Sequence, residues 1–231
     1  MNILRENNQF QGFLWDVEGV LVDTEEIHFR SWQWLLEQTG STPLTIEEYA
    51  SCVGSPSTVN MERVARLRNL SGNLDNLRRL RRDKFEELCL EEIPVIEKNV
   101  ELVKQFNRMF PSAQFATVSN APRAFIEKYL KITRLQEILQ LKVSFDDIQG
   151  LNKKPAPDLY LYTLGLMNIS QDSCIGFEDS QSGIVALKTA GITAIALPNR
   201  LTASLDFSLA DMVLKPGEKR DAGEIIKSLT K

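Results

Sequence analysis

"LWDVEGVLVDT", residues 14–24, begins as an apolar strand and stops at an acid, Asp16. Glu18 follows two positions later, and side chains at i and i+2 project to the same side of an extended chain. Two carboxylates at one strand end indicate a binding or catalytic site. The stretch also raises a question, because the second acid is the longer glutamate.

The chain on either side of Pro94 has two different patterns. From residue 24 to about 94 the pattern predicts helices only, at 24–39, 45–50, 57–70 and 74–91. Later strands alternate with helices, and we place these strands at 114–118, 141–143, 174–177, 192–197 and 212–214. Such alternation predicts βαβ units and a parallel sheet. The first strand, near residues 13–15, must join that sheet. We therefore expect an α/β Rossmann-like core (1–23 and 95–231) with an inserted all-helical domain (24–94).

Composition narrows the classes of function. The 231 residues carry a net charge of −4 and a pI near 5.3, which argues against nucleic acid as a partner. The basic run at 78–82 is followed directly by acids and predicts a solvated helix face, with a phosphate-facing role for one of its arginines as the alternative. No apolar stretch is long enough for a membrane span. Three sparse cysteines and no secretion signal favour a cytoplasmic protein with small buried thiols, and we expect a monomer.

Polar residues gather where the predicted strands end, and ligands bind at the carboxyl ends of an open parallel sheet. These residues are Asp16, Glu18, Ser119, Asn120, Glu178 and Asp179, with Lys154 in a further connection. Oxygen ligands without His or Cys favour Mg²⁺ over zinc. A lysine and a hydroxyl beside them suit a phosphate, and a carboxylate can attack phosphorus to form an aspartyl-phosphate.

Four motifs in order resemble those of the haloacid dehalogenase (HAD) superfamily phosphatases, in the branch similar to β-phosphoglucomutase with a small helical cap. They are Asp16–Thr24 for D-x-D-G-x-x-x-D-[ST], Ser119 for the strand-ending Ser or Thr (with Thr117 as the weaker candidate), Lys154–Asp158 for K-P-x-P-D, and Glu178–Ile184 for E-D-S-x-x-G-I. The likeness extends over essentially the whole chain from residue 12. It implies a Mg²⁺-dependent phosphatase acting on a small phosphorylated metabolite such as a sugar phosphate.

The resemblance also implies roles for the acids. Asp16 would be the nucleophile and a Mg²⁺ ligand, the backbone carbonyl of Glu18 a second ligand and Asp179 a third. Glu178 would support the ion through water. In the family the second acid protonates the leaving oxygen and then activates water, and here that role falls to Glu18.

The phosphate-binding roles carry over in the same way. Ser119 and the backbone amide of Asn120 would hold a phosphoryl oxygen, and Lys154 would neutralise the nucleophile and the phosphate. Ser119 could also cap the helix predicted from 122, since a helix N-terminus attracts anions.

The helical insertion offers further candidates. His28 and Trp32 lie one turn apart, where relatives similar to β-phosphoglucomutase often place a His and a Trp near the active-site mouth. The alternative is a partly buried amphipathic pair. Gly54 stands where the mutases have a phosphate-binding loop, but the arginine expected after it is replaced by Ser55-Pro56-Ser57. Other arginines could compensate, namely Arg63, Arg66, Arg81 and Arg82.

Three functions therefore stay open. The first is a phosphatase, and the second a phosphomutase, which the loop after Gly54 disfavours. The third is a catalytically weakened binder of a phosphorylated ligand or a protein, because Glu18 replaces the usual aspartate. The added methylene moves the carboxyl by about 1 Å or more, and a misplacement of that size can cost about 100-fold in rate.

Overall fold

The chain forms two compact units in the computed structural model, which describes residues 10–53, 55–91, 93–147 and 149–230. One unit comprises the chain up to Val22 and from Val95 onward, and the other comprises Asp23–Pro94. The second unit starts at Asp23, one residue before the predicted boundary. That the two units are separate domains stays a prediction.

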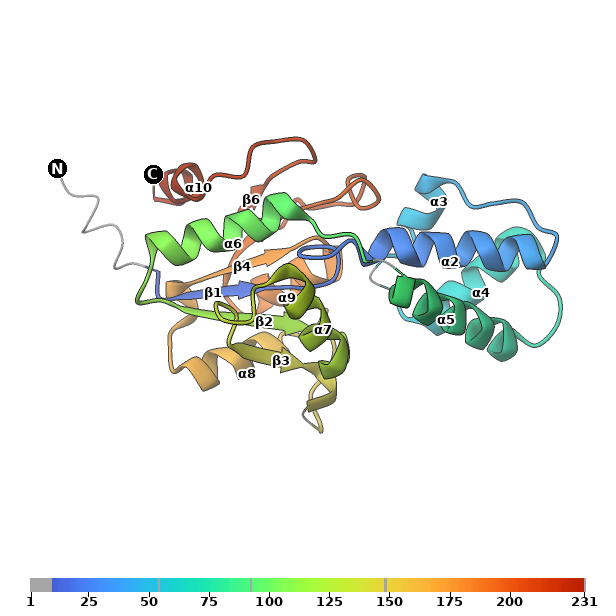
Figure 1. The fold of residues 1–231 in the computed structure, drawn as a ribbon, viewed down its shortest axis with the longest axis horizontal. Coiled ribbons are helices and arrows are strands. Elements are labelled where there is room, and N and C mark those ends of the chain that lie inside the picture. Colours follow the sequence, from blue (N-terminus) through green and yellow to red (C-terminus); the bar gives the residue numbers. More distant parts are fainter. Residues whose placement is uncertain (1–9, 54, 92, 148, 231) are drawn as a thin grey trace. The chain divides into compact units, whose positions relative to one another are not determined.

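The first unit is built on one six-stranded parallel sheet, drawn in Figure 1. Its strands are β1 (Gly12–Trp15), β2 (Gln114–Ser119), β3 (Leu141–Ser144), β4 (Cys174–Glu178), β5 (Thr193–Ala196) and β6 (Met212–Val213). The order across the sheet is β3-β2-β1-β4-β5-β6, and every neighbouring pair is parallel. The predicted α/β fold with a parallel sheet is confirmed.

Helices of the first unit cover both faces of this sheet. They are α6 (Glu97–Met109), α7 (Arg123–Thr133), α8 (Asp158–Met167), α9 (Gln181–Thr189) and α10 (Ala222–Leu229), with 3₁₀ turns η1 (Phe145–Asp147) and η2 (Gln171–Ser173). The side chains of successive β1 residues project to opposite faces of the sheet. Phe13 packs against Phe106 of α6 and against Phe110, which follows that helix, whereas Leu14 belongs to the core with the buried residues of α8 and α9.

The central position of β1 explains where the site lies. β1 pairs with β2 on one side and with β4 on the other, so three carboxyl ends meet at the same edge of the sheet. The Asp16 N–H donates to the Phe177 carbonyl at 3.0 Å, which fixes the first acid beside the end of β4. The order of strands changes direction at β1, and such a switch point is where this class of sheet binds ligands.

The second unit is helical. Its elements are α2 (Thr24–Gln38), α3 (Ile46–Ala50), α4 (Ser57–Arg68) and α5 (Leu74–Glu91), with α2 packed against α5. The predicted helical insertion is confirmed, and the described residues of this unit form no β-sheet. Asp23 caps α2 by accepting from the Glu26 N–H at 3.1 Å, so Thr24 is the first helical residue.

Two expectations about side-chain burial have different outcomes. All three cysteines are free and buried, as predicted. The predicted solvated face at 78–82 is wrong at Arg81, which is only 8% exposed and points into the helical unit. Within the part of the chain that the structure describes, no helix combines the length and apolar composition that a membrane crossing requires.

Candidate active site

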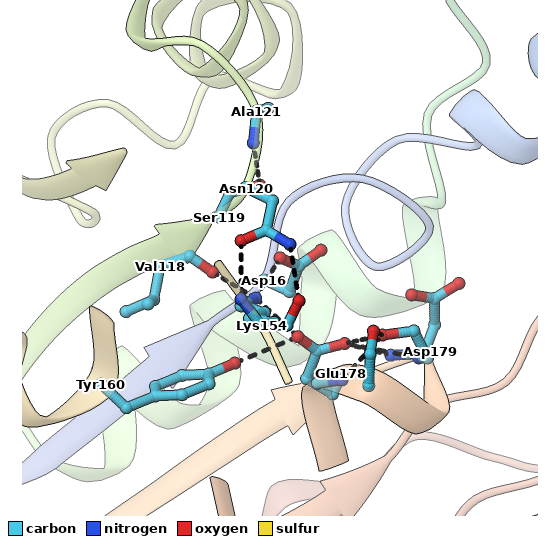
Figure 2. Close-up of polar contacts among 12 residues, drawn as sticks. Asp16, Val118, Ser119, Asn120, Ala121, Lys154, Tyr160, Glu178 and Asp179 are labelled. Atoms are coloured by element: carbon cyan, nitrogen blue, oxygen red, sulfur yellow. Dashed lines mark hydrogen bonds and ion pairs between the residues drawn. The ribbon is translucent and has the colours of Figure 1, made fainter. Parts of the chain in front are cut away.

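Lys154 is the centre of the polar cluster at the sheet edge. Its Nζ donates to Asp16 Oδ1 at 2.6 Å, to the Val118 carbonyl at 2.7 Å and to Glu178 Oε1 at 2.6 Å. Figure 2 shows these contacts converging from the ends of β1, β2 and β4. An ammonium group has three donors, and each is used. The lysine therefore ties together the ends of three strands.

Burial gives this cluster unusual electrostatics, because Asp16 and Lys154 are each only 7% exposed. Burial raises the pKa of the Asp16 carboxyl, against the attraction of Lys154. Burial alone would lower the pKa of Lys154, but the charges of Asp16 and Glu178 outweigh it and hold that pKa well above its usual value. Lys154 is thus a fixed positive charge beside the carboxyl that the sequence predicts as nucleophile.

Both carboxyl oxygens of Glu178 have donors from the protein. Oε1 accepts from Lys154 and, at 3.1 Å, from the hydroxyl of Tyr160. Oε2 accepts from the Asp179 N–H at 3.2 Å and from the Ser180 hydroxyl at 3.0 Å. Gly183 leaves room for the group, since a Cβ there would lie 1.9 Å from its carboxyl carbon. Glu178 is therefore held in one orientation at the end of β4.

Asp179 is aligned from two other loops. Its Oδ2 accepts from Asn199 Nδ2 at 3.0 Å, and Asn199 lies in the connection after β5. Gly19 has φ +77°, and a Cβ there would lie 2.0 Å from the same Asp179 oxygen. Any residue larger than glycine would therefore displace this carboxylate, which explains the glycine in the opening stretch.

Ser119 and Asn120 end β2 and shape the loop that carries Lys154. The Ser119 hydroxyl accepts from the Ala121 N–H at 3.2 Å. It does not cap α7, whose N-cap is Pro122 without a side-chain hydrogen bond. Asn120 Oδ1 accepts from the Lys154 N–H at 3.1 Å, so its side chain fixes the lysine loop. That Ser119 and the Asn120 amide bind phosphate stays a prediction.

Glu18 lies in the tight turn that follows β1. Its neighbour Gly19 donates to the Val22 carbonyl at 2.8 Å, which closes the turn. The Glu18 side chain is half-buried, and its Oε1 accepts from the hydroxyl of Tyr129 on α7 at 3.4 Å. The glutamate therefore reaches a partner in the core.

The acids at this edge fit a divalent cation. Asp16, Glu178 and Asp179 each offer an oxygen, and these atoms all lie within 4.8 Å of one another. Oxygen-only donor sets suit Mg²⁺. Because both oxygens of Glu178 already have protein donors, Asp16 and Asp179 are the better placed direct ligands, with Glu178 beside them.

His28 and Trp32 both take part in packing within the helical unit. The imidazole of His28 stacks on Phe85 of α5, with ring centroids 3.9 Å apart. The guanidinium of Arg81 lies 4.9 Å from the Trp32 ring centroid and donates to Ser31 Oγ at 3.1 Å. A role in substrate binding stays a prediction for His28 and Trp32, while Gly54 lies outside the described residues.

The four arginines proposed as substitutes for the missing loop arginine all have contacts inside this unit. Arg63 donates to the Ser51 carbonyl, and Arg66 pairs with Glu62 at 3.5 Å. Arg82 lies near Asp83 and Glu86, at 3.4 and 3.8 Å. Arg81, described above, is the buried member of the four.

Two residues of the site were not predicted from the sequence, Asn199 and Tyr160. Asn199 follows Leu197 and Pro198 at the end of a predicted strand, so the strand-end rule that found Asp16 and Ser119 could also have found it. Tyr160 lies in α8, an apolar helix in which a tyrosine has the appearance of ordinary core. No sequence signal indicated that its hydroxyl would reach Glu178.

The family model described as "Haloacid dehalogenase-like hydrolase" matches residues 13–197, which include every core residue of this site except Asn199. The chain belongs to the haloacid dehalogenase-like hydrolases. The resemblance stated from four motifs is therefore confirmed at the level of the family, and the protein is a HAD-like hydrolase.

Relatives of this hydrolase include phosphatases of phosphorylated sugars. The phosphorylated carbohydrates phosphatase of Thermotoga maritima is 28% identical over 189 residues, 80% of this chain and 83% of that protein. The fructose-1-phosphate phosphatase YqaB of Escherichia coli is 25% identical, over 81% of this chain and 96% of that protein.

Solved structures agree with the fold. CbbY from Rhodobacter sphaeroides, solved in complex with phosphate, is 25% identical with a TM-score of 0.66, over 89% of this chain and 93% of that one. A HAD-like protein from Agrobacterium tumefaciens has a TM-score of 0.82 at 20% identity, over 96% of this chain and 100% of that one, and shows the fold alone.

Proposed function

We propose that this hydrolase is a Mg²⁺-dependent phosphatase that acts on a small phosphorylated metabolite through an aspartyl-phosphate on Asp16. The observation that carries the proposal is the 2.6 Å contact between Lys154 Nζ and Asp16 Oδ1 at the carboxyl edge of the sheet. A carboxylate beside a fixed cation can approach a phosphoryl group, because the cation offsets the repulsion between two anions.

The residues for a metal ion are the acids of the same edge. Asp16, Asp179 and the backbone carbonyl of Glu18 would hold Mg²⁺, and Glu178 would support it through water. When bound, Mg²⁺ neutralises negative charge on the phosphoryl oxygens and on the attacking carboxylate. Ser119 and the Asn120 amide would hold a phosphoryl oxygen, and the charge of Lys154 would neutralise the nucleophile and the phosphate.

The proposed chemistry has two steps that balance. First, an Asp16 oxygen forms a bond to phosphorus while the bond from phosphorus to the leaving oxygen breaks, and Glu18 gives its proton to that oxygen. Second, the Glu18 carboxylate takes a proton from water, whose oxygen attacks the same phosphorus and releases phosphate from Asp16. Glu18 thus ends protonated and ready for the next substrate.

A sugar phosphate is the substrate class that we favour. Two curated relatives, at 28% and 25% identity, carry names that refer to phosphorylated carbohydrates and to fructose 1-phosphate. That His28 and Trp32 take part in substrate recognition stays a prediction from the sequence. A cytoplasmic location and a monomeric state stay predictions from the sequence.

The test is a panel of phosphomonoesters, dominated by sugar phosphates, assayed for phosphate release with and without Mg²⁺. We expect release by the wild type that falls at least ~1000-fold in Asp16→Asn, because the nucleophile is lost. Asp172→Asn, an exposed aspartate in η2, is the matched control and should equal the wild type. Hydrolysis of no compound above the Asp16→Asn background would overturn the proposal.

The same panel separates the two alternatives. A phosphomutase would yield an isomeric sugar phosphate and depend on a bisphosphate activator, in place of phosphate release. A weakened binder would be protected against unfolding by a phosphorylated ligand but would not turn it over. Glu18→Asp, run in parallel, shows whether the native glutamate limits the rate.

A further inference from the structure

The Tyr129 hydroxyl is a polar group placed deep in the core of the first unit. Tyr129 is fully buried on α7, with its ring beside Phe125. A buried tyrosine hydroxyl needs a hydrogen-bond partner, because leaving it without one costs the free energy of its lost hydration. Here the hydroxyl lies 3.4 Å from Glu18 Oε1, at the long end of hydrogen-bond distances.

We propose that Tyr129 is the positioning residue for Glu18 and that the two form a matched pair. The inference rests on the proposed function, in which Glu18 is the acid and base. Glu18 comes from the turn after β1, whereas Tyr129 comes from the helix after β2. The hydrogen bond therefore connects a turn at the sheet edge to α7, where the ring of Tyr129 is buried in the core.

Length is the reason that the pair requires a glutamate. Aspartate has one methylene fewer, so its carboxyl would lie about 1 Å or more further from α7. Added to 3.4 Å, that retreat places the nearest oxygen beyond hydrogen-bond reach of the tyrosine. An aspartate at this position would thus leave the buried hydroxyl without this partner.

The contact suits a group that changes its protonation state in each turnover. A tyrosine hydroxyl donates to a carboxylate and accepts from a carboxylic acid, so it can hold Glu18 in both states. Tyr129 itself exchanges no proton with the substrate. Its effect is to restrict the rotamers of a side chain that is longer and more flexible than aspartate, and so to preorganise the proton transfer.

Two substrates with different leaving groups test the pair. An alkyl phosphate needs a proton on its leaving oxygen, whereas 4-nitrophenyl phosphate releases a stable phenolate without one. We would measure kcat/KM with Mg²⁺ for both substrates on Tyr129→Phe, Glu18→Asp and the double variant. Tyr162→Phe, an exposed tyrosine on α8, is the matched control.

We expect Tyr129→Phe to lower kcat/KM about 10-fold for the alkyl phosphate and less than about 2-fold for 4-nitrophenyl phosphate. In the Glu18→Asp background, Tyr129→Phe should change kcat/KM by less than about 2-fold for either substrate, because the shorter acid does not reach the hydroxyl. Tyr162→Phe should equal the wild type throughout.

Three results would overturn the inference while leaving the phosphatase intact. One is an equal loss on both substrates, which indicates a purely structural effect. Another is the same loss from Tyr129→Phe in the wild-type and Glu18→Asp backgrounds, and the third is no loss at all in Tyr129→Phe. If the wild type hydrolyses neither substrate above Asp16→Asn, the proposed function itself fails, and the positioning role fails with it.

Discussion

Among the residues that the structure describes, each unit buries one cation, and the two cations differ in their direct contacts. In the sheet unit, Lys154 is 7% exposed and contacts two carboxylates, Asp16 and Glu178, at 2.6 Å each. In the helical unit, Arg81 is 8% exposed, and its described contacts are a hydroxyl, an imidazole nitrogen at 3.4 Å and a Trp face. The first cation donates directly to two carboxylates, whereas the direct contacts of the second are neutral and the carboxylate of Glu25 acts on it only through its charge.

This difference has chemical consequences for the neighbours of each cation. Lys154 lets two acids stay close together without solvent, which is the condition for a nucleophile that must meet a phosphate. Arg81 acts on a neighbour that could itself become positive. Burial, together with the charge of Arg81, lowers the pKa of His28 to about 3. His28 is thus a neutral side chain at every physiological pH.

The largest expected effect is the removal of the core cation. Lys154→Met leaves Asp16 and Glu178 buried without their partner, so we expect a loss of about 3 to 5 kcal/mol in the free energy of unfolding. Hydrolysis should also fall to the Asp16→Asn level. Urea unfolding measures the first effect, with Lys188→Met as the matched control.

The control lysine pairs with Asp211 at 2.7 Å but is one-third exposed, so its loss should cost less than about 1 kcal/mol. If Lys154→Met and Lys188→Met lower the free energy of unfolding equally, the burial of Lys154 and its two acids does not contribute to stability.

Acid should destabilise the protein through His28. The unfolded histidine binds a proton near pH 6.5 and the folded one near 3, so this stabilisation is complete above 6.5 and is lost as the pH falls. At about pH 5 the loss should be about 1 to 2 kcal/mol relative to about pH 7. His28→Asn should remove that part of the difference between the two pH values.

Glu25, in the same unit, gives the stability of the protein the opposite dependence on pH. Burial raises its pKa to about 6, so its protonated form is favoured by folding, and this stabilisation is lost as the pH rises through 6. Comparing wild type with His28→Asn isolates the histidine. Because the chain has one histidine, NMR of the imidazole also tests the claim directly. A pKa near 6.5 in the folded protein would contradict it.

A smaller effect is expected from the second donor to Glu178. Burial, together with the charge of Glu178, raises the pKa of Tyr160 well above its usual value, so its hydroxyl stays protonated and donates. Tyr160→Phe should lower the free energy of unfolding by about 1 to 2 kcal/mol and should lower kcat a few-fold. Lys154 still holds Glu178 in this variant. A loss as large as that of Lys154→Met would mean that the tyrosine, and not the lysine, orients Glu178.

The smallest effect should come from the cation of the helical unit. Arg81→Met breaks no described hydrogen bond to a carboxylate and removes only the charge interaction with Glu25, so the unfolding free energy should change by about 1 kcal/mol, well below the cost of Lys154→Met. The pKa of His28 should rise, because a positive neighbour is removed. Urea unfolding and the NMR titration measure both. If Arg81→Met costs as much as Lys154→Met, the contrast between the two cations fails.

The sheet edge was predictable because its signals are local. Apolar runs that end on Asp16, Ser119 and Glu178 indicate strands, and parallel strands bring their ends together whatever the intervening segments do. The glutamate at 18 was also visible, but its partner was not. Tyr129 reaches it through the packing of a helix 111 residues later in the chain.

The helical unit was less predictable from the sequence because its side-chain burial also depends on how the helices pack. The basic run at 78–82 has the composition of a solvated face, and only the packing of α5 against α2 turns Arg81 inward. Trp34 is only half-buried, although a tryptophan in an amphipathic helix suggests a core position, and it lines a groove with Arg30 and Lys84. Which face of a short amphipathic helix is covered depends on its neighbours, not on its own sequence.

The covalent intermediate tests the central claim most directly. During turnover of the best panel substrate with Mg²⁺, the reaction is quenched in acid, digested and analysed by peptide mass spectrometry. We predict a phosphoryl group on the peptide that contains Asp16, and neither adduct nor turnover in Asp16→Asn. Hydrolysis that continues at the wild-type rate in Asp16→Asn, with no adduct on that peptide, would contradict the account.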